Sequence, residues 1–136
     1  ETDICIRTLR STDEGVAFLV LAEGKTIYHA GDLNDWYWKE ESEDWNQEMS
    51  AKFRKYIEPL RDRKIDAAFI PLDPRQEEYY TLGMDYFLEL AKPEKVYPMH
   101  FWRKPEIIER WLEEHPQSQD RDRIVRITEE GELFKQ

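Results

Sequence analysis

The stretch TIYHAGD, residues 26–32, decides how the rest of this sequence is interpreted, because it carries an apolar run directly into a glycine and a carboxylate. It follows the apolar run VAFLVLA and the turn EGK, a layout typical of a hairpin of two buried strands. Two later stretches, AAFIPLD (67–73) and VYPMH (96–100), also end an apolar run in a polar residue. The sequence therefore places a polar side chain after each of three predicted strands.

The segments around these strands predict a single α/β domain over residues 1–136. The alternating stretch DICIRTL (3–9) predicts a first strand. Apolar residues that recur every three or four positions predict helices at 44–60, 80–91 and from Pro105 to Pro116, with Pro59 stopping or kinking the first. RIVRI and ELF, split by the turn TEEG, predict a closing strand pair at 123–127 and 132–134. Strands first, then helices and strands in alternation, indicate a mixed β-sheet flanked by helices.

The predicted strands VAFLVLA and AAFIPL are apolar on both faces, since neither shows a clean alternation of apolar and polar residues. Strands of this kind are typical of sheets that are covered on both sides. The three predicted helices suffice for one face. Something else must cover the other.

Composition limits the class of partner. Thirty acidic and twenty basic residues give a net charge of −10, which argues against nucleic acid or an anionic membrane as a direct partner. The single cysteine, Cys5, has no partner for an internal disulfide and suits a reducing, cytoplasmic location. No apolar run approaches the roughly 20 residues of a membrane span. The chain begins with Glu1 rather than Met, which suggests a processed product or a fragment.

Asp32, Asp73 and His100 are the first candidates for chemistry, because ligands collect beyond the carboxyl ends of strands in open α/β sheets. A carboxylate and a neutral imidazole are ligands suited to zinc, manganese or iron. Catalytic zinc usually takes three protein ligands and keeps one open position. A pair of such residues therefore needs further ligands.

The order of four motifs, STDEGVAF, HAGDLNDWYW, PLDPR and PMHFW, resembles the C-terminal half of the metallo-β-lactamase superfamily, in a branch of zinc-dependent hydrolases. The resemblance covers most of the chain. It implies one half of a four-layer αββα sandwich with a dinuclear metal site at one edge of the paired sheets. By the same resemblance Asp32 is the aspartate that bridges the two metals, His100 ligates one of them, and the intact protein hydrolyses a small-molecule substrate.

The sequence departs from the family pattern in two places. The main metal motif of the family, H-x-H-x-D-H, is absent, since the only histidines are His29, His100 and His115. Where many members have a ligating histidine before the hairpin, this chain has Ser11, with Asp13 nearby. A serine hydroxyl is a poor zinc ligand, so Asp13 or a water is needed there. Hydrolysis by this chain alone is not expected.

Each candidate has a simpler alternative. Asp32 after Gly31 is also a common turn-former, and His100 is also suited to a hydrogen bond at a strand end. Arg75 is assigned to substrate binding because its guanidinium suits an anionic group, but a loop salt bridge to Asp73 explains it equally well. Asn34 and Trp36 are the other substrate-binding candidates. Trp36 and the adjacent Tyr37 and Trp38 suit either a substrate pocket or a loop anchor, with at least one ring near the mouth of the site.

The two remaining histidines are interpreted as structural. His29 alternates with Ile27 and is expected to face the core, and His115 ends a predicted helix, where a partly positive ring complements the helix dipole.

We therefore predict the C-terminal half of a zinc-dependent hydrolase, with an exposed apolar sheet face that is covered either in a homodimer or by the missing N-terminal half. The alternative is a metal-free binding or structural domain that kept the fold without the chemistry.

Overall fold

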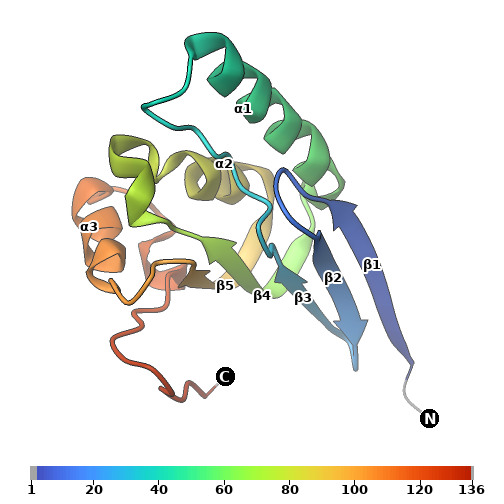
Figure 1. Ribbon diagram of the computed structural model, residues 1–136. Coiled ribbons are helices and arrows are strands. Elements are labelled where there is room, and N and C mark those ends of the chain that lie inside the picture. Colours follow the sequence, from blue (N-terminus) through green and yellow to red (C-terminus); the bar gives the residue numbers. More distant parts are fainter. Residues whose placement is uncertain (1–2, 136) are drawn as a thin grey trace.

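The computed structural model describes residues 3–135 and contains one five-stranded sheet in the order β1-β2-β3-β4-β5 (Figure 1). The first three strands pair antiparallel, and β3, β4 and β5 pair parallel. The structure thus confirms the α/β class and the mixed sheet. The strands are β1 (Ile4–Arg10), β2 (Val16–Ala22), β3 (Lys25–His29), β4 (Lys64–Pro71) and β5 (Lys92–Met99).

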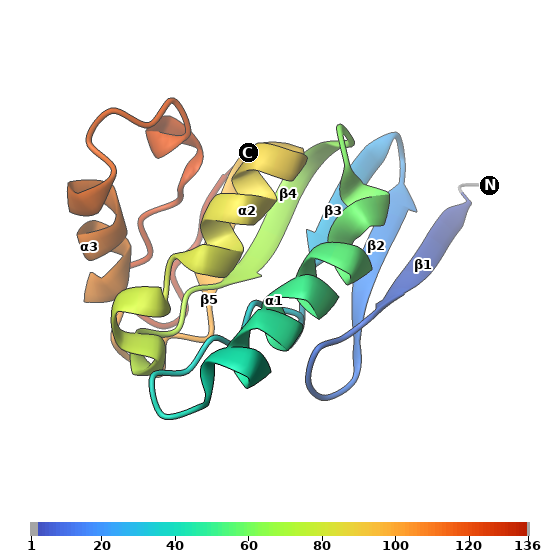
Figure 2. The same cartoon turned by 90° about the horizontal axis from the view of Figure 1, so that it is seen from above.

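Helices α1 (Glu43–Ile57) and α2 (Leu82–Leu90) lie on one face of the sheet, and α3 (Glu106–Glu114) packs beside α2 (Figures 1 and 2). Helix α1 starts at Ser42, whose hydroxyl accepts the N–H of Trp45 and so satisfies a backbone donor of the first turn. Pro59 lies in the 3-10 turn that follows α1, as its missing N–H predicts.

The core lies between the sheet and these helices. Buried strand residues point into it, among them Leu19, Tyr28 and Ala68, all at most 1% exposed. The Tyr28 ring stacks on Phe87 of α2, with ring centroids 5.7 Å apart. Burial of such side chains is worth about 1.5–3 kcal/mol each and orients the sheet relative to the helices.

The opposite face of the sheet carries apolar side chains that no helix covers. The strand register puts Ile6, Val20 and Ile27 side by side on this face. Ile6 is 60% exposed and Phe18 41%. The predicted exposed apolar sheet face is therefore confirmed, and we call it the uncovered face. His29 alternates with the buried Tyr28 and is exposed on this face, so the prediction that His29 faces the core is wrong.

The predicted closing strand pair is also wrong. Ile124 makes one isolated parallel bridge to Val96, and the rest of residues 123–134 forms no strand. The N–H of Thr128, in the predicted turn, donates to the side-chain carboxylate of Glu132 at 2.8 Å. A side chain thus closes this turn, and no backbone ladder follows it. Residues 127–134 run past the uncovered face beside β5, where Ile127 and Phe134 line a cavity.

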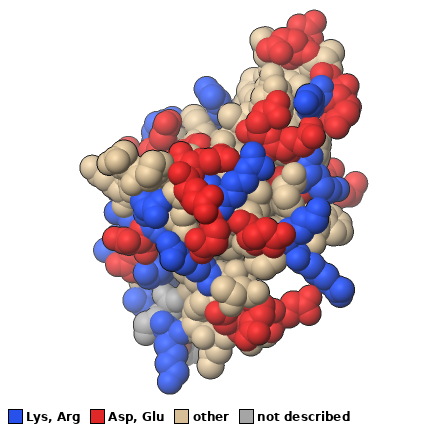
Figure 3. Space-filling view, turned by 90° about the vertical axis from the view of Figure 1, so that its left-hand side faces the viewer, with Lys and Arg blue, Asp and Glu red and all other residues tan. Residues whose placement is uncertain are grey.

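Acidic and basic side chains are interspersed on the side of the molecule that carries α3 (Figure 3). Ion pairs there join Arg110 to Glu114 and Arg126 to Glu109, so neither sign dominates this surface. Within residues 3–135, no helix combines the length and apolar character needed to cross a membrane.

Candidate functional site

Three parallel strands bring their carboxyl ends to one edge of the sheet. Asp32, Asp73 and His100 follow β3, β4 and β5 within three residues. Gly31 makes the first of these turns possible, because it has a φ of +57° and a Cβ there would lie 3.0 Å from the carbonyl oxygen of Val16. The sequence Ala-Gly-Asp is thus the local requirement for turning β3 towards the site.

His100 and Asp32 meet at this edge. Nε2 of His100 lies 3.2 Å from Oδ1 of Asp32, and the two side chains are 21% and 33% exposed. The two residues follow different strands and lie side by side at one edge of the sheet, as expected. Their role as metal ligands stays a prediction.

Asp73 backs His100 from the inside. Its side chain is 0% exposed, and its Oδ2 lies 2.9 Å from Nδ1 of His100, which therefore donates to it. The same Oδ2 accepts Trp102 Nε1 at 3.2 Å and Arg75 Nη2 at 2.8 Å, while Oδ1 accepts the backbone N–H of Arg75 at 2.9 Å. With its lone pairs already used, Asp73 acts as a support for His100 rather than as a further ligand.

The hydrogen bonds keep Asp73 ionised despite its burial. Burial by itself raises the pKa of this carboxyl, but the bonds from Arg75, His100 and Trp102 outweigh burial, and the pKa is lowered from its ordinary value. A carboxylate that is ionised at neutral pH and bonded to Nδ1 orients the ring so that Nε2 faces Asp32. Sequence analysis named Asp73 among the candidates at the strand ends but gave it no role in the metal site.

The pair of donors fits part of a zinc site. Two ligand atoms at about 2.0–2.1 Å from one tetrahedral zinc ion lie roughly 3.3 Å apart, close to the 3.2 Å between Nε2 of His100 and Oδ1 of Asp32. A histidine ligand whose other nitrogen donates to a carboxylate is the common outer arrangement around zinc. Across residues 3–135, however, no group of three or more His, Cys, Asp or Glu side chains is placed to hold a metal. His100 and Asp32 are thus two donors that would suit such a site, and it would need further ligands.

Arg75 forms the salt bridge that was the alternative to substrate binding. Its Nη2 lies 2.8 Å from Asp73, and its side chain remains 52% exposed. The guanidinium also lies over two rings, 4.7 Å from the centroid of Trp102 and 5.7 Å from that of Trp38. The hydrogen bond that Arg75 donates to Asp73, and the charges of Asp73 and Asp13, raise the pKa of Arg75, although burial opposes them.

Two tryptophans flank His100. Trp36 is 4% exposed, donates its Nε1 to the backbone oxygen of Asp32 at 2.8 Å, and has its ring 5.1 Å from the imidazole. Trp36 thus anchors the loop and also forms a wall of the site. Trp102, which the sequence did not single out, lies on the other side of His100 with its ring at 5.8 Å, and it is 60% exposed.

Asn34 has a packing position. It is 1% exposed, and its amide donates to the side chain of Gln76 at 2.9 Å. A Cβ on Gly83 of α2 would lie 1.9 Å from the Asn34 side-chain oxygen, so the glycine leaves room for this amide. A substrate could reach Asn34 only by breaking a buried hydrogen bond, and its assignment to substrate binding loses its structural basis.

The loop that carries Ser11 and Asp13 docks on the site loop through Thr12. The Thr12 hydroxyl donates to the backbone oxygen of Asn34 at 2.7 Å and accepts its N–H at 3.1 Å. Ser11 accepts the N–H of Asp13, which closes a local turn. His115, at the end of α3, lies as predicted, with Nδ1 2.7 Å from the carbonyl oxygen of Trp111.

The comparison with protein-family models gives no match to this chain. The search among curated proteins gives none either.

Proposed function

We propose that this chain contributes Asp32 and His100 to the metal centre of a zinc-dependent hydrolase of the metallo-β-lactamase superfamily. The observation that carries the proposal is the line from buried Asp73 through His100 to Asp32, with 2.9 Å at one nitrogen and 3.2 Å at the other. It adds to the resemblance of the four sequence motifs. A bound zinc ion would supply the Lewis acidity for hydrolysis of a lactone, ester, amide or phosphodiester.

The residues of this chain have distinct parts in that proposal. Asp73 accepts the hydrogen bond from Nδ1–H of His100 and thereby leaves the Nε2 lone pair directed at the rim. Asp32 supplies a carboxylate that is one-third exposed and faces the same point. Trp36 excludes water from one side of the imidazole, since its ring is buried against it. Arg75 balances the charge of Asp73 and keeps that carboxylate from competing for the metal.

The remaining ligands would come from protein that packs on the uncovered face. Ile6, Phe18 and Ile27 expose an apolar surface there, of the kind that marks an interaction site. Either a second copy of the chain or a preceding N-terminal half would cover this surface and bring ligands to the same edge. The substrate in the proposal is a small molecule.

A titration with zinc tests the ligand roles without a substrate. The chain offers a matched control, because His115 also has a ring nitrogen close to an aspartate, with Nε2 3.0 Å from Oδ2 of Asp85. We expect the imidazole NMR resonances of His100 to shift on addition of zinc, while those of His115 stay. Asp32→Ala should weaken the response of His100, and Asp85→Ala should leave it unchanged. Equal shifts at both histidines would contradict the proposal.

One observation favours the metal-free binding or structural domain instead. Both nitrogens of His100 already face carboxylates, so the cluster is hydrogen-bonded without an ion. In that case zinc leaves the resonances of His100 unshifted even at millimolar concentration, and Asp32→Ala alters stability alone.

A further inference from the structure

We propose that Trp102 is a stacking platform for a flat, uncharged or anionic ring of the substrate, beside the candidate ligand His100. The placement of that ring relative to the reacting group rests on the proposed function. The platform itself rests on the geometry of the turn after β5.

This turn holds three non-glycine residues in the left-handed region. His100, Trp102 and Arg103 have φ of 68°, 51° and 62°. Such backbone is costly for side chains with a Cβ and persists where the surroundings enforce it, commonly at functional sites. The result is that neighbouring residues of one short turn present an imidazole to Asp32 and an indole to solvent.

The indole is exposed yet held in place. Its Nε1 donates to the buried carboxylate of Asp73 at 3.2 Å, and its ring lies nearly perpendicular to that of His100, with centroids 5.8 Å apart. An exposed tryptophan without such anchors loses conformational entropy when it binds a ligand. The Trp102 indole is 60% exposed but already held in place, so binding a ligand costs it less entropy, and its surface is pre-organised.

Arg75 determines which rings the platform favours. Its guanidinium carbon lies over the Trp102 ring, 4.7 Å from the centroid, so one side of the indole carries a cation. Arg75 already draws the electron density of the indole towards one face of the ring, so the opposite face attracts a second cation less strongly. An electron-rich ring without positive charge therefore suits the opposite face better. Among residues 3–135 no hydrogen bond is found for Nη1 of Arg75, so this edge of the fork is open to an anionic substituent.

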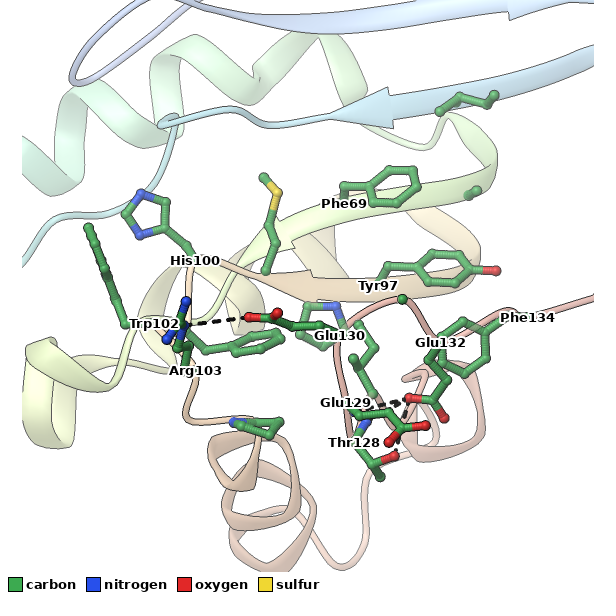
Figure 4. Close-up of a pocket in the computed structure, with 18 residues that line it drawn as sticks. Phe69, Tyr97, His100, Trp102, Arg103, Thr128, Glu129, Glu130, Glu132 and Phe134 are labelled. Atoms are coloured by element: carbon green, nitrogen blue, oxygen red, sulfur yellow. Dashed lines mark hydrogen bonds and ion pairs between the residues drawn. The ribbon is translucent and has the colours of Figure 1, made fainter.

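The surroundings provide room for such a ring. Trp102 and His100 lie at one end of an open cavity of about 1180 Å³, with Tyr97 and Phe134 at the other (Figure 4). The lining is largely apolar and includes Phe69, Met99 and Phe101. A ring stacked on Trp102 would therefore lie beside the imidazole rather than in bulk water.

Three naphthalene probes of equal size test the proposal on the full chain in the presence of a metal chelator: naphthoate, naphthylmethanol and naphthylmethylammonium. We expect the indole N–H resonance of Trp102 to shift with the anionic and neutral probes, and both to bind more tightly than the cation. The overall charge of −10 would by itself give the opposite order. Tightest binding by the cation would overturn the proposal.

Substitutions separate stacking from general adhesion. Trp102→Ala should weaken naphthoate binding by about two- to tenfold, the usual worth of an aromatic pair. Trp102→Phe, which keeps a ring but lacks the N–H, should bind naphthoate more tightly than Trp102→Ala does and guards against loss of the fold. Trp45 on α1 is also exposed and serves as the control, since Trp45→Ala should leave binding unchanged. Equal losses in Trp102→Ala and Trp45→Ala would refute a specific platform.

The chelator separates this test from that of the proposed function. If the probes bind at Trp102 while zinc fails to shift His100, the platform stands and the hydrolase proposal falls. If zinc shifts the resonances of His100 but none of the three probes shifts the indole resonance of Trp102, only the proposal of a stacking platform is refuted.

Discussion

Nδ1 of His100 lies 2.9 Å from Oδ2 of Asp73, a carboxylate with no exposed surface. A carboxylate in such a position keeps its charge only because donors surround it, and here the donors come from Arg75, His100 and Trp102. The buried aspartate thus organises three residues that line the site. Most predictions about this site follow from that dependence.

Asp73→Ala should destabilise the chain by about 3 kcal/mol, because it leaves donors of Arg75, His100 and Trp102 without their buried acceptor. Urea denaturation at neutral pH measures the change in the free energy of unfolding. Asp122→Ala is the control at an exposed position and should change that free energy by less than about 0.5 kcal/mol. A loss below about 1 kcal/mol in Asp73→Ala would mean that the hydrogen bonds are not a source of stability.

The same carboxyl should make stability depend on acid pH. The pKa of Asp73 is lowered in the folded chain from the ordinary 3.8, so its contribution is present above that value and disappears as the pH falls through the folded-state pKa. The free energy of unfolding of the wild type should therefore fall below pH 4 more steeply than that of Asp73→Asn. Urea denaturation curves between pH 2 and pH 5 compare the two proteins. Parallel pH profiles would show that Asp73 does not titrate as described.

Gly31→Ala should destabilise the chain more than Gly24→Ala does. Both glycines have positive φ, +57° and +75°, so both variants incur the left-handed backbone penalty of about 1 kcal/mol. A Cβ on Gly31 also lies 3.0 Å from the Val16 carbonyl oxygen, whereas nothing lies within 4 Å of one on Gly24. Urea denaturation gives the free energy of unfolding of both variants, and the difference between them isolates this contact. Equal losses would mean that the Val16 carbonyl does not restrict the residue at position 31.

The sequence predicted the site edge well, because strand ends can be identified locally. Apolar runs that stop at Asp32, Asp73 and His100 fix three positions, and parallel pairing of β3, β4 and β5 brings them together. Trp102 could not be predicted in the same way. Its place beside His100 depends on left-handed backbone at non-glycine residues, which tertiary contacts enforce and local sequence does not indicate.

Two other failures have the same origin in long-range structure. Alternation shows that Ile27 and His29 share a face, but it does not show which face the helices cover, and these two residues lie on the uncovered face. RIVRI has the composition of a strand, yet Ile124 makes one isolated bridge to Val96, and the turn after RIVRI is closed by the Glu132 side chain at Thr128. Propensity gave way to tertiary context in both cases.

The uncovered face should cause association. Phe18→Glu places a charge among the apolar side chains of β1, β2 and β3, so we expect it to lower the sedimentation coefficient of any self-associated species to that of the monomer. Leu133→Glu is the control, since Leu133 is 83% exposed but lies outside the sheet. Analytical ultracentrifugation over a range of concentrations compares the two variants. A wild type that is monomeric throughout would argue against a homodimer and leave a preceding segment as the cover in the proposal.

Gly83→Ala should destabilise the chain. At an unhindered helix position the same change would stabilise it by about 0.5–1 kcal/mol, because alanine is the better helix former. The added Cβ would lie 1.9 Å from the side-chain oxygen of Asn34, so the amide must move and lose the bond that its nitrogen donates to Gln76. If this clash is the cause, Asn34→Ala should remove most of the penalty, so that the double variant is more stable than the sum of the two single changes predicts. Urea denaturation of the four proteins gives the coupling energy. Additive changes would mean that the clash with the Asn34 amide is not the reason why Gly83→Ala destabilises the chain.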